Sequence, residues 1–326
     1  MKKIFILTGL TLLLIESISA QSVDCSVVSV NEESSIKFTK ITSDNDFVCM
    51  PQVVRKGGNI DWLSNRILDI SSDGEKLAYL SFRSNTTNIF IKDIEKRSSS
   101  IQRTNRQNVL DFSYSPDGKN ICFSEAVDNV SRIFVTDANK GYTCRQITSN
   151  DQDYTPIYAW DMSQIYFSRQ ENSTLSVWSY NVGDNYLSNI TKGMNPYPLK
   201  NENAILCVRS TEGGRNEIWK VNLDTGIEEC IVSDINHSFT TPSVSPDGKW
   251  ILLVGSSKVN GGTFFYQNTD IYACKIDGTE LTQITYHAAD DLSPVWSRDG
   301  KYIYFISQRG SATAIANIWR MNFNLK

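Results

Sequence analysis

Both histidines of the sequence stand in polar segments that also contain carboxylates. His237 and His287 each precede an apolar segment that we interpret as the first strand of a repeat, and Asp290 and Asp291 share the second of these loops. A cluster of imidazole and carboxylate groups can bind a transition metal. The matching loops before two other repeats contain Asp151, Asp153, Tyr154 and Asn195. The sequence therefore predicts a binding site where these loops meet, and the alternative is two surface histidines with no ligand.

Nucleophilic catalysis finds little support in the sequence. It contains no Gly-x-Ser-x-Gly elbow and no His-Glu-x-x-His metalloprotease helix. A serine or cysteine triad would have to use one of the two histidines, and neither stands in a recognisable partner pattern. We therefore assign no catalytic residue, no metal and no cofactor, and we expect a protein that is not an enzyme.

A recurring turn motif indicates how the histidine loops are positioned. Two degenerate copies, at Asp161-Met162-Ser163 and Asn201-Glu202-Asn203, stand between clear ones. The steps between copies are about 40 to 50 residues, which is typical of a propeller with one four-stranded blade per repeat. The four clear copies are Ser72-Asp73-Gly74-Glu75, Pro116-Asp117-Gly118-Lys119, Pro246-Asp247-Gly248-Lys249 and Arg298-Asp299-Gly300-Lys301.

Each repeat has the same internal order. An apolar segment precedes the turn, an apolar strand follows it, a third strand contains an apolar-aromatic pair, and a fourth ends in threonine or a substitute. The sixth repeat lacks its fourth strand, whereas Phe38–Ser43 resembles the fourth strand Leu281–Thr285 but has no blade before it. The sequence therefore predicts an all-β, six-bladed β-propeller with four antiparallel strands per blade, in which the N-terminal strand closes the last blade and removes a sheet edge.

The Ser-Pro-Asp-Gly-Lys turn, the apolar-aromatic third strand and the terminal Ile-Thr resemble the repeats of the TolB C-terminal propeller, which are also described as WD-like. The resemblance covers residues 36–326, and it implies an exported bacterial propeller. TolB has an α/β domain of over a hundred residues before its propeller. Because only about fifty residues separate the predicted leader from the first full blade, we expect a TolB-like propeller that lacks this domain.

The N-terminus has the pattern of a secretory signal peptide. Lys2 and Lys3 precede an apolar stretch of about a dozen residues, which is too short for a membrane span, and small residues lead to Ala20. We expect cleavage after Ala20, an N-terminal segment at 21–35, and a periplasmic or secreted protein without membrane insertion. The net charge is −4 and no basic run occurs, so we expect no nucleic-acid partner.

The seven cysteines bear on disulfides, which an exported protein can form. Two pairs fall on the second and fourth strands of one repeat, about 9 Å apart or more, which exceeds the roughly 7 Å limit for a bridge. These pairs, for which we predict no disulfide, are Cys122 with Cys144 and Cys207 with Cys230. Cys25 and Cys49, both before the first blade, remain the one pair that could form a bridge.

The function that these features favour is a non-catalytic scaffold that binds a protein of the cell envelope, or a glycan. Exposed aromatics beside glycines suit partner contact, and the longest repeat contains an insertion with Phe264, Phe265 and Tyr266. The alternative is a metal-dependent enzyme that processes a polysaccharide or its fragments. That alternative resembles the oligogalacturonate lyases, which have propellers with TolB-like repeats and a metal held by several histidines.

Overall fold

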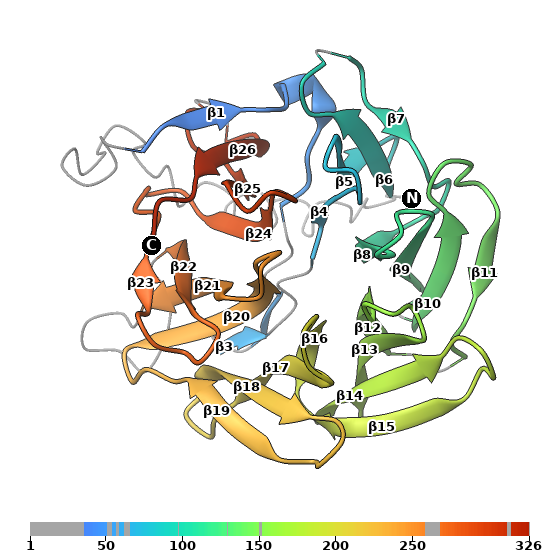
Figure 1. Ribbon diagram of the computed structural model, residues 1–326. Coiled ribbons are helices and arrows are strands. Elements are labelled where there is room, and N and C mark those ends of the chain that lie inside the picture. Colours follow the sequence, from blue (N-terminus) through green and yellow to red (C-terminus); the bar gives the residue numbers. More distant parts are fainter. Residues whose placement is uncertain are drawn as a thin grey trace, which may run out of the picture.

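The computed structural model describes residues 36–50, 54–56, 59–61, 66–96, 98–128, 130–149, 152–257, 268–311 and 314–325. Figure 1 shows six antiparallel sheets arranged as blades around a central axis. The predicted signal peptide, the segment 21–35 and Cys25 lie outside the described residues, as do Asp151 and the insertion residues Phe264, Phe265 and Tyr266.

The six blades have four strands each, numbered from the inside of the ring outwards. Blade 1 contains β4 (Leu68–Ile70), β5 (Lys76–Arg83), β6 (Thr86–Asp93) and β7 (Ile101–Gln102). Blade 2 contains β8 (Val109–Tyr114), β9 (Asn120–Val127), β10 (Val130–Asp137) and β11 (Cys144–Gln146). Blade 3 contains β12 (Asp153–Tyr158), β13 (Gln164–Glu171), β14 (Thr174–Asn181) and β15 (Leu187–Lys192).

The other three blades repeat this order, and the last one uses the first strand of the chain. Blade 4 contains β16 (Met194–Pro198), β17 (Ala204–Ser210), β18 (Asn216–Asn222) and β19 (Glu228–Val232). Blade 5 contains β20 (His237–Val244), β21 (Trp250–Ser257), β22 (Thr269–Lys275) and β23 (Thr282–Gln283). Blade 6 contains β24 (Asp291–Trp296), β25 (Tyr302–Ser307), β26 (Asn317–Asn322) and β1 (Phe38–Lys40). Outside the blades lie the short helix η2 (Asp44–Asp46) and the hairpin β2 (Val54–Lys56) and β3 (Asn59–Asp61). The six-bladed fold that the repeats predict is thus confirmed.

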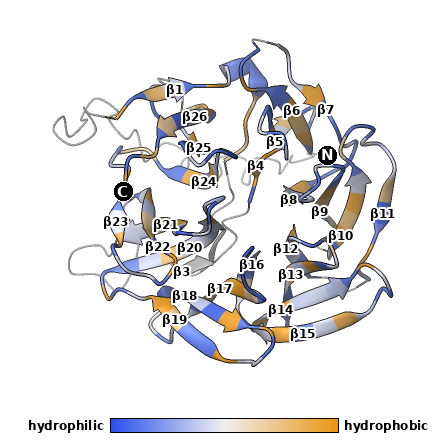
Figure 2. Ribbon diagram, viewed as in Figure 1, coloured by the Kyte–Doolittle hydropathy of each residue, from blue (hydrophilic) through white to orange (hydrophobic). Residues whose placement is uncertain are grey.

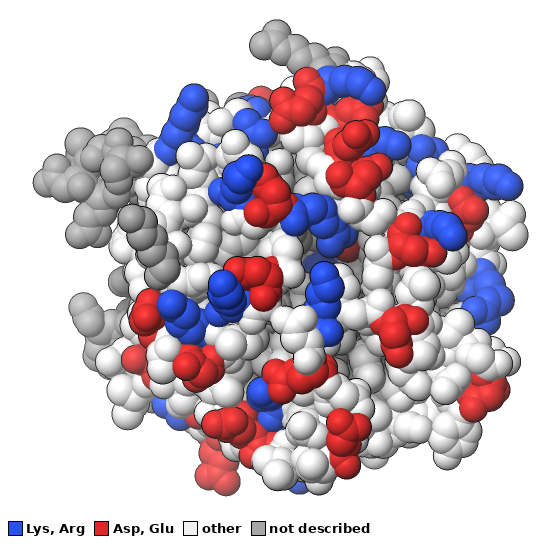
Figure 3. All heavy atoms as spheres, viewed as in Figure 1, with Lys and Arg blue, Asp and Glu red and all other residues white. Residues whose placement is uncertain are grey.

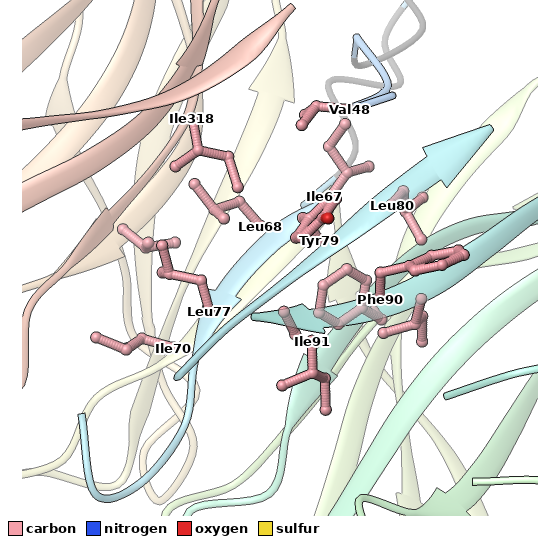
Figure 4. Packing of buried hydrophobic residues seen from close by; sticks show 14 of the residues in the cluster. Val48, Ile67, Leu68, Ile70, Leu77, Tyr79, Leu80, Phe90, Ile91 and Ile318 are labelled. Atoms are coloured by element: carbon pink, nitrogen blue, oxygen red, sulfur yellow. The ribbon is translucent and has the colours of Figure 1, made fainter. Parts of the chain in front are cut away.

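The core consists of side chains that fill the spaces between neighbouring blades. The second strands are buried over most of their length, because a blade is covered on both faces. Figure 2 shows the corresponding hydrophobic bands along the strands. In Figure 4, Ile318 of blade 6 lies beside Leu68 of blade 1, within one buried cluster that also contains Leu77 and Phe90. The first and last blades therefore pack like any other neighbouring pair.

The Asp-Gly motif forms the turn between the first and second strands, as the sequence predicts. The Ser115 hydroxyl donates to Asp117 Oδ1 at 2.6 Å, and the Lys119 amide donates to the same oxygen at 3.0 Å. Gly118 follows with φ = 71°, which glycine adopts without strain. The serine before the motif thus belongs to the turn as well. All these turns lie on one face of the ring, which we call the turn face.

The hydroxyl of the threonine at the end of the fourth strand takes the place of a backbone carbonyl as hydrogen-bond acceptor for the third strand. In blade 1 the Ile89 amide donates to Thr104 Oγ1 at 2.9 Å, and in blade 2 the Ile133 amide donates to Thr148 Oγ1 at 3.0 Å. Both threonines are buried. Because the hydroxyl satisfies an amide that the short fourth strand would leave without a partner, the Ile-Thr pattern recurs along the sequence.

The ring is closed by the N-terminal strand, as predicted. β1 pairs antiparallel with β26, from Phe38 opposite Met321 to Lys40 opposite Trp319. Beyond this ladder, the Ile318 amide donates to Thr42 Oγ1 at 2.8 Å, and the Thr42 hydroxyl donates to Asn317 Oδ1 at 3.0 Å.

The cysteines have the predicted placement. β10 separates Cys122 from Cys144, and β18 separates Cys207 from Cys230, and all four are free thiols. Burial raises the pKa of Cys122 and Cys207 to about 12, so neither is a thiolate at neutral pH. The pairing of Cys49 with Cys25 stays a prediction, because Cys25 lies outside the described residues.

We predict that Thr42→Ala destabilises the ring, because it leaves the buried Ile318 amide without its acceptor. The free energy of unfolding should fall by about 1–3 kcal/mol, measured by denaturant unfolding. Thr143→Ala, at an exposed threonine, is the matched control and should change stability by less than about 0.5 kcal/mol. Equal losses in the two variants would contradict this role of Thr42.

We also predict an acid-sensitive contribution from the turns. Hydrogen bonds from the preceding serine and from backbone amides hold the pKa of Asp117, Asp247 and Asp299 below the ordinary value of 3.8. A lowered folded-state pKa contributes stability above about pH 4 that is lost as the pH falls through and below 3.8. Replacing the three aspartates by asparagine, which keeps an acceptor oxygen but does not titrate, should flatten the decline of the unfolding midpoint over this interval. An unchanged slope would assign the decline to other carboxylates.

Candidate functional site

The innermost strands of five blades shift in pairing register against the second strand, and in four of them the shift is a β-bulge at a proline, which the sequence analysis missed. At each bulge a residue with φ between 49° and 52° precedes a proline, and the pairing register with the second strand shifts. Proline is tolerated there because these strands form the inner edge of each sheet, where no further strand accepts their hydrogen bonds. The bulges lie at Thr155-Pro156, Asn195-Pro196, Thr241-Pro242 and Ser293-Pro294.

The bulges correct the predicted position of several candidate residues. We expected them in loops before the first strands, but the strands extend through the bulges and include them. The residues that lie in first strands are Asp153, Tyr154, Asn195, His237 and Asp291. Only His287 and Asp290 lie, as expected, in the segment before β24. The sequence analysis ended each strand at its apolar segment, since a bulge leaves no hydrophobic signal.

Two of the candidate carboxylates form buried ion pairs with arginines. Asp153 accepts two hydrogen bonds from Arg169, at 2.7 and 3.0 Å, and Asp291 contacts Arg309 Nη2 at 2.5 Å. Both carboxylates are fully buried. Such pairs fix the start of the first strands and are out of reach of a ligand.

The two histidines have separate local contacts. His237 Nδ1 lies 2.8 Å from Asp234 Oδ1, and its ring lies against Phe239. His287 is buried, and its Nδ1 accepts a hydrogen bond from the Ala289 amide at 2.9 Å. Within the described ranges, no three His, Cys, Asp or Glu side chains gather into a group that could hold a metal ion. The face on which His237 and His287 lie, where the first strands begin, is called the histidine face below.

A cavity of about 350 Å³ lies at the opposite end of the channel, where the first strands meet the turns. All six blades contribute to it, and Figure 3 shows Lys and Arg side chains around the central hollow of this face. As far as the described chain goes, its lining includes no histidine and no cysteine. The aromatic lining residues are Tyr114, Tyr158, Trp160, Tyr197 and Trp296, and the charged ones are Arg66, Asp69, Lys200 and Arg298.

Hydrogen bonds between neighbouring blades hold the cavity wall in place. Trp160 Nε1 donates to the Pro198 carbonyl, and Trp296 Nε1 donates to the Ser243 carbonyl, both at 3.0 Å. Arg298 donates from blade 6 to the Ile70 carbonyl of blade 1 at 2.6 Å. The carbonyls of the inner strands, which have no further strand to pair with, thus accept from side chains of the next blade. These contacts join neighbouring blades at the cavity wall.

Arg66 reaches across the channel. It precedes β4 of blade 1, yet its Nη2 lies 3.3 Å from the Pro196 carbonyl of blade 4, on the opposite side of the ring. Its guanidinium carbon lies 5.7 Å from the centre of the Tyr197 ring. Arg66 is 7% exposed, and its Nη1 has no hydrogen-bond partner among the described residues. Nothing in the repeat pattern marks this arginine, because it stands outside the repeated motifs.

Asp69 is the one carboxylate among the described lining residues, and it is already hydrogen-bonded by backbone amides. Asp69 accepts hydrogen bonds from the Ile70 amide at 2.7 Å and the Tyr114 amide at 2.8 Å. Burial raises the pKa of Asp69, and the charges of Arg298 and Arg66 oppose that rise. The cavity thus presents more positive than negative charge, between aromatic walls.

These observations define the protein as a closed β-propeller repeat protein with a ligand-sized cavity on its axis. The model of the TolB beta propeller domain matches residues 27–267, and the chain belongs to this family.

Solved structures with the same fold have several activities. The chain is similar to a protein assigned as TolB from Agrobacterium tumefaciens (17% identity, 80% of this chain and 90% of that one, TM-score 0.62). It is also similar to TolB from Acinetobacter baumannii (19% identity, 71% of this chain and 56% of that one, TM-score 0.55). A third similar structure is an oligogalacturonate lyase from Vibrio parahaemolyticus (12% identity, 90% of this chain and 95% of that one, TM-score 0.60). At these identities the similarity shows the fold alone.

Proposed function

We propose that the protein is a non-catalytic binding scaffold of the cell envelope, which takes a protein partner at the mouth of the channel on the turn face. The observation that carries this proposal is the cavity on the axis, to which all six blades contribute. A wall held by hydrogen bonds between blades loses little freedom when a partner binds, which favours affinity.

The composition of the cavity supports this proposal. Tryptophan, tyrosine and arginine are the residues that contribute most to protein interfaces, and all three line the mouth. The volume of about 350 Å³ falls in the range of ligand sites and would accept a side chain or a chain terminus.

Export of the protein is part of the proposal. The pattern of residues 1–20 supports a leader that directs the chain to the periplasm or beyond. In the described part of the chain, no helix has the length and hydrophobicity to span a membrane.

The histidine face is the second candidate surface for a partner. His237 is partly exposed there, and from the sequence we expect the insertion with Phe264, Phe265 and Tyr266, which lies outside the described residues, to add aromatics on the same side. Exposed aromatics favour contact with a partner, so variants on both faces are needed to locate the interface.

We predict that the double variant Trp160→Ala/Lys200→Ala binds the partner at least tenfold more weakly, because it removes one aromatic wall and one cation from the mouth. Trp160 is half-buried and Lys200 exposed, so the ring should still fold. The measurement is capture from envelope extracts with the propeller as bait, followed by titration of the captured protein.

Controls on the histidine face separate the two surfaces. Phe82→Ala removes an aromatic that is 54% exposed at the end of β5 away from the turns, and it should leave binding unchanged. If Phe82→Ala or Phe264→Ala/Phe265→Ala abolishes capture while the mouth variant binds normally, the partner uses the histidine face instead.

The alternative function is a metal-dependent enzyme of the oligogalacturonate-lyase type, one of which was solved in complex with manganese. It would need His237, His287 and nearby carboxylates to share one ion, whereas their described contacts are separate. We predict that protein purified without chelator or histidine tag contains no stoichiometric metal, and that His237→Ala/His287→Ala does not differ. Metal that is present in the wild type and lost in the variant would favour the enzyme over the scaffold.

A further inference from the structure

The charge of the channel cavity points to the chemistry of its ligand. We propose that the cavity binds a carboxylate group of the partner, with Arg66 as its principal donor. This inference rests on the proposed scaffold function and goes beyond it, because it names the chemical group that enters the channel.

One donor of Arg66 has no partner among the described residues, and the residue lines the cavity. Its Nη2 is used by the Pro196 carbonyl, which fixes the guanidinium on the axis of the ring. Nη1 is buried and has no acceptor among the described residues, although Arg66 lines the cavity. A buried donor without an acceptor is unfavourable, and a charged oxygen acceptor satisfies it best.

The other charged groups of the lining also favour a negatively charged ligand. Lys200 and Arg298 add two cations to that of Arg66. Both oxygens of Asp69 accept backbone amides, and this one carboxylate is shared between the charges of Arg298 and Arg66. The lining thus has three cations and one carboxylate, and although the buried Asp111 carboxylate also interacts with Arg66, the excess of positive charge in the lining attracts anions.

The aromatic walls of the cavity indicate which chemical group stands next to the carboxylate in the ligand. Trp160 and Trp296 have their indole N–H groups engaged by carbonyls of the neighbouring blade, so the rings present apolar surface. Tyr158 and Tyr197 complete this lining. The ligand is therefore a segment of the partner that carries its carboxylate next to an apolar or aromatic group, either at a C-terminus or on an acidic side chain.

The test uses two small probes that differ only in charge. N-acetyl-L-phenylalanine carries a free carboxylate beside an aromatic ring, and N-acetyl-L-phenylalaninamide is its neutral counterpart. We expect the wild-type protein to bind the acid at least tenfold more tightly than the amide at low salt, measured by calorimetry or by NMR titration. Equal binding of both probes, or no binding of the acid, would overturn the proposal, and neither result depends on a variant.

Variants then assign the preference to one residue. Arg66→Met should remove the preference for the acid, and Arg66→Lys should keep a reduced preference, because lysine retains the charge without the planar fork. Arg145→Met is the matched control at an exposed arginine of β11 and should keep the full preference. If Arg66→Met unfolds, the same contrast is measured for Lys200→Met, which is exposed at the mouth and should retain a weakened preference. An Arg66→Met protein that folds and still prefers the acid tenfold would refute the role of Arg66.

The outcomes separate this inference from the proposed function. If capture of the partner depends on Trp160 and Lys200 but the two probes bind equally, the scaffold function stands and the carboxylate site is wrong. If the acid binds but capture is unaffected by the mouth variant, the channel is a small-molecule site and the partner surface is wrong. Galacturonic acid serves as a further probe. If it binds more tightly than N-acetyl-L-phenylalanine, the ligand of the channel is an acidic glycan and not a segment of a protein.

Discussion

The pairing of β1 with β26 is the constraint on which the rest of the structure depends. It joins residues about 280 positions apart in the sequence, as in the contact of Thr42 with Asn317, and it gives blade 6 its fourth strand. Closure also brings blade 6 against blade 1, where Arg298 donates to the Ile70 carbonyl. Only in a closed ring is the distance between opposite blades fixed, so the span of Arg66 from blade 1 to Pro196 of blade 4 exists because the ring is closed.

Each blade of the closed ring still has two edges, an outer one at its fourth strand and an inner one at its first strand, and the inner edges surround the channel. An open edge favours pairing with other chains unless it is blocked. Here the bulges and their prolines remove donors, and side chains of the next blade use the remaining carbonyls, as Trp160 uses that of Pro198 and Trp296 that of Ser243. The same contacts that block the edges also form the aromatic walls, so the cavity follows from how the fold treats its inner edges.

The sequence predicts the parts of the molecule that follow a hydrophobic or turn pattern, and it misses the bulges, although these recur with a proline in four blades. The Asp-Gly turns, the terminal threonines and the closing strand could be predicted because each obeys a local rule several times over, as Asp117 and Thr148 illustrate. The bulge at Ser293 has no hydrophobic signal, so Asp291 was expected in a loop although it lies in β24. Arg66 stands outside the repeat pattern, and its role depends on the geometry of the whole ring.

The presence of Arg66 in the channel is hard to explain by stability. A buried charge is costly to desolvate, and leaving one of its donors without an acceptor adds about 1–3 kcal/mol. A methionine would fill the same length beside Tyr197 without that cost, and the ring would lose a single hydrogen bond to Pro196. Sequences usually break such local rules where function requires it. The charges of Asp69 and Asp111 offset part of the cost of burying Arg66. The unused donor of Arg66 therefore adds to the shape of the cavity as an argument for a ligand in the channel.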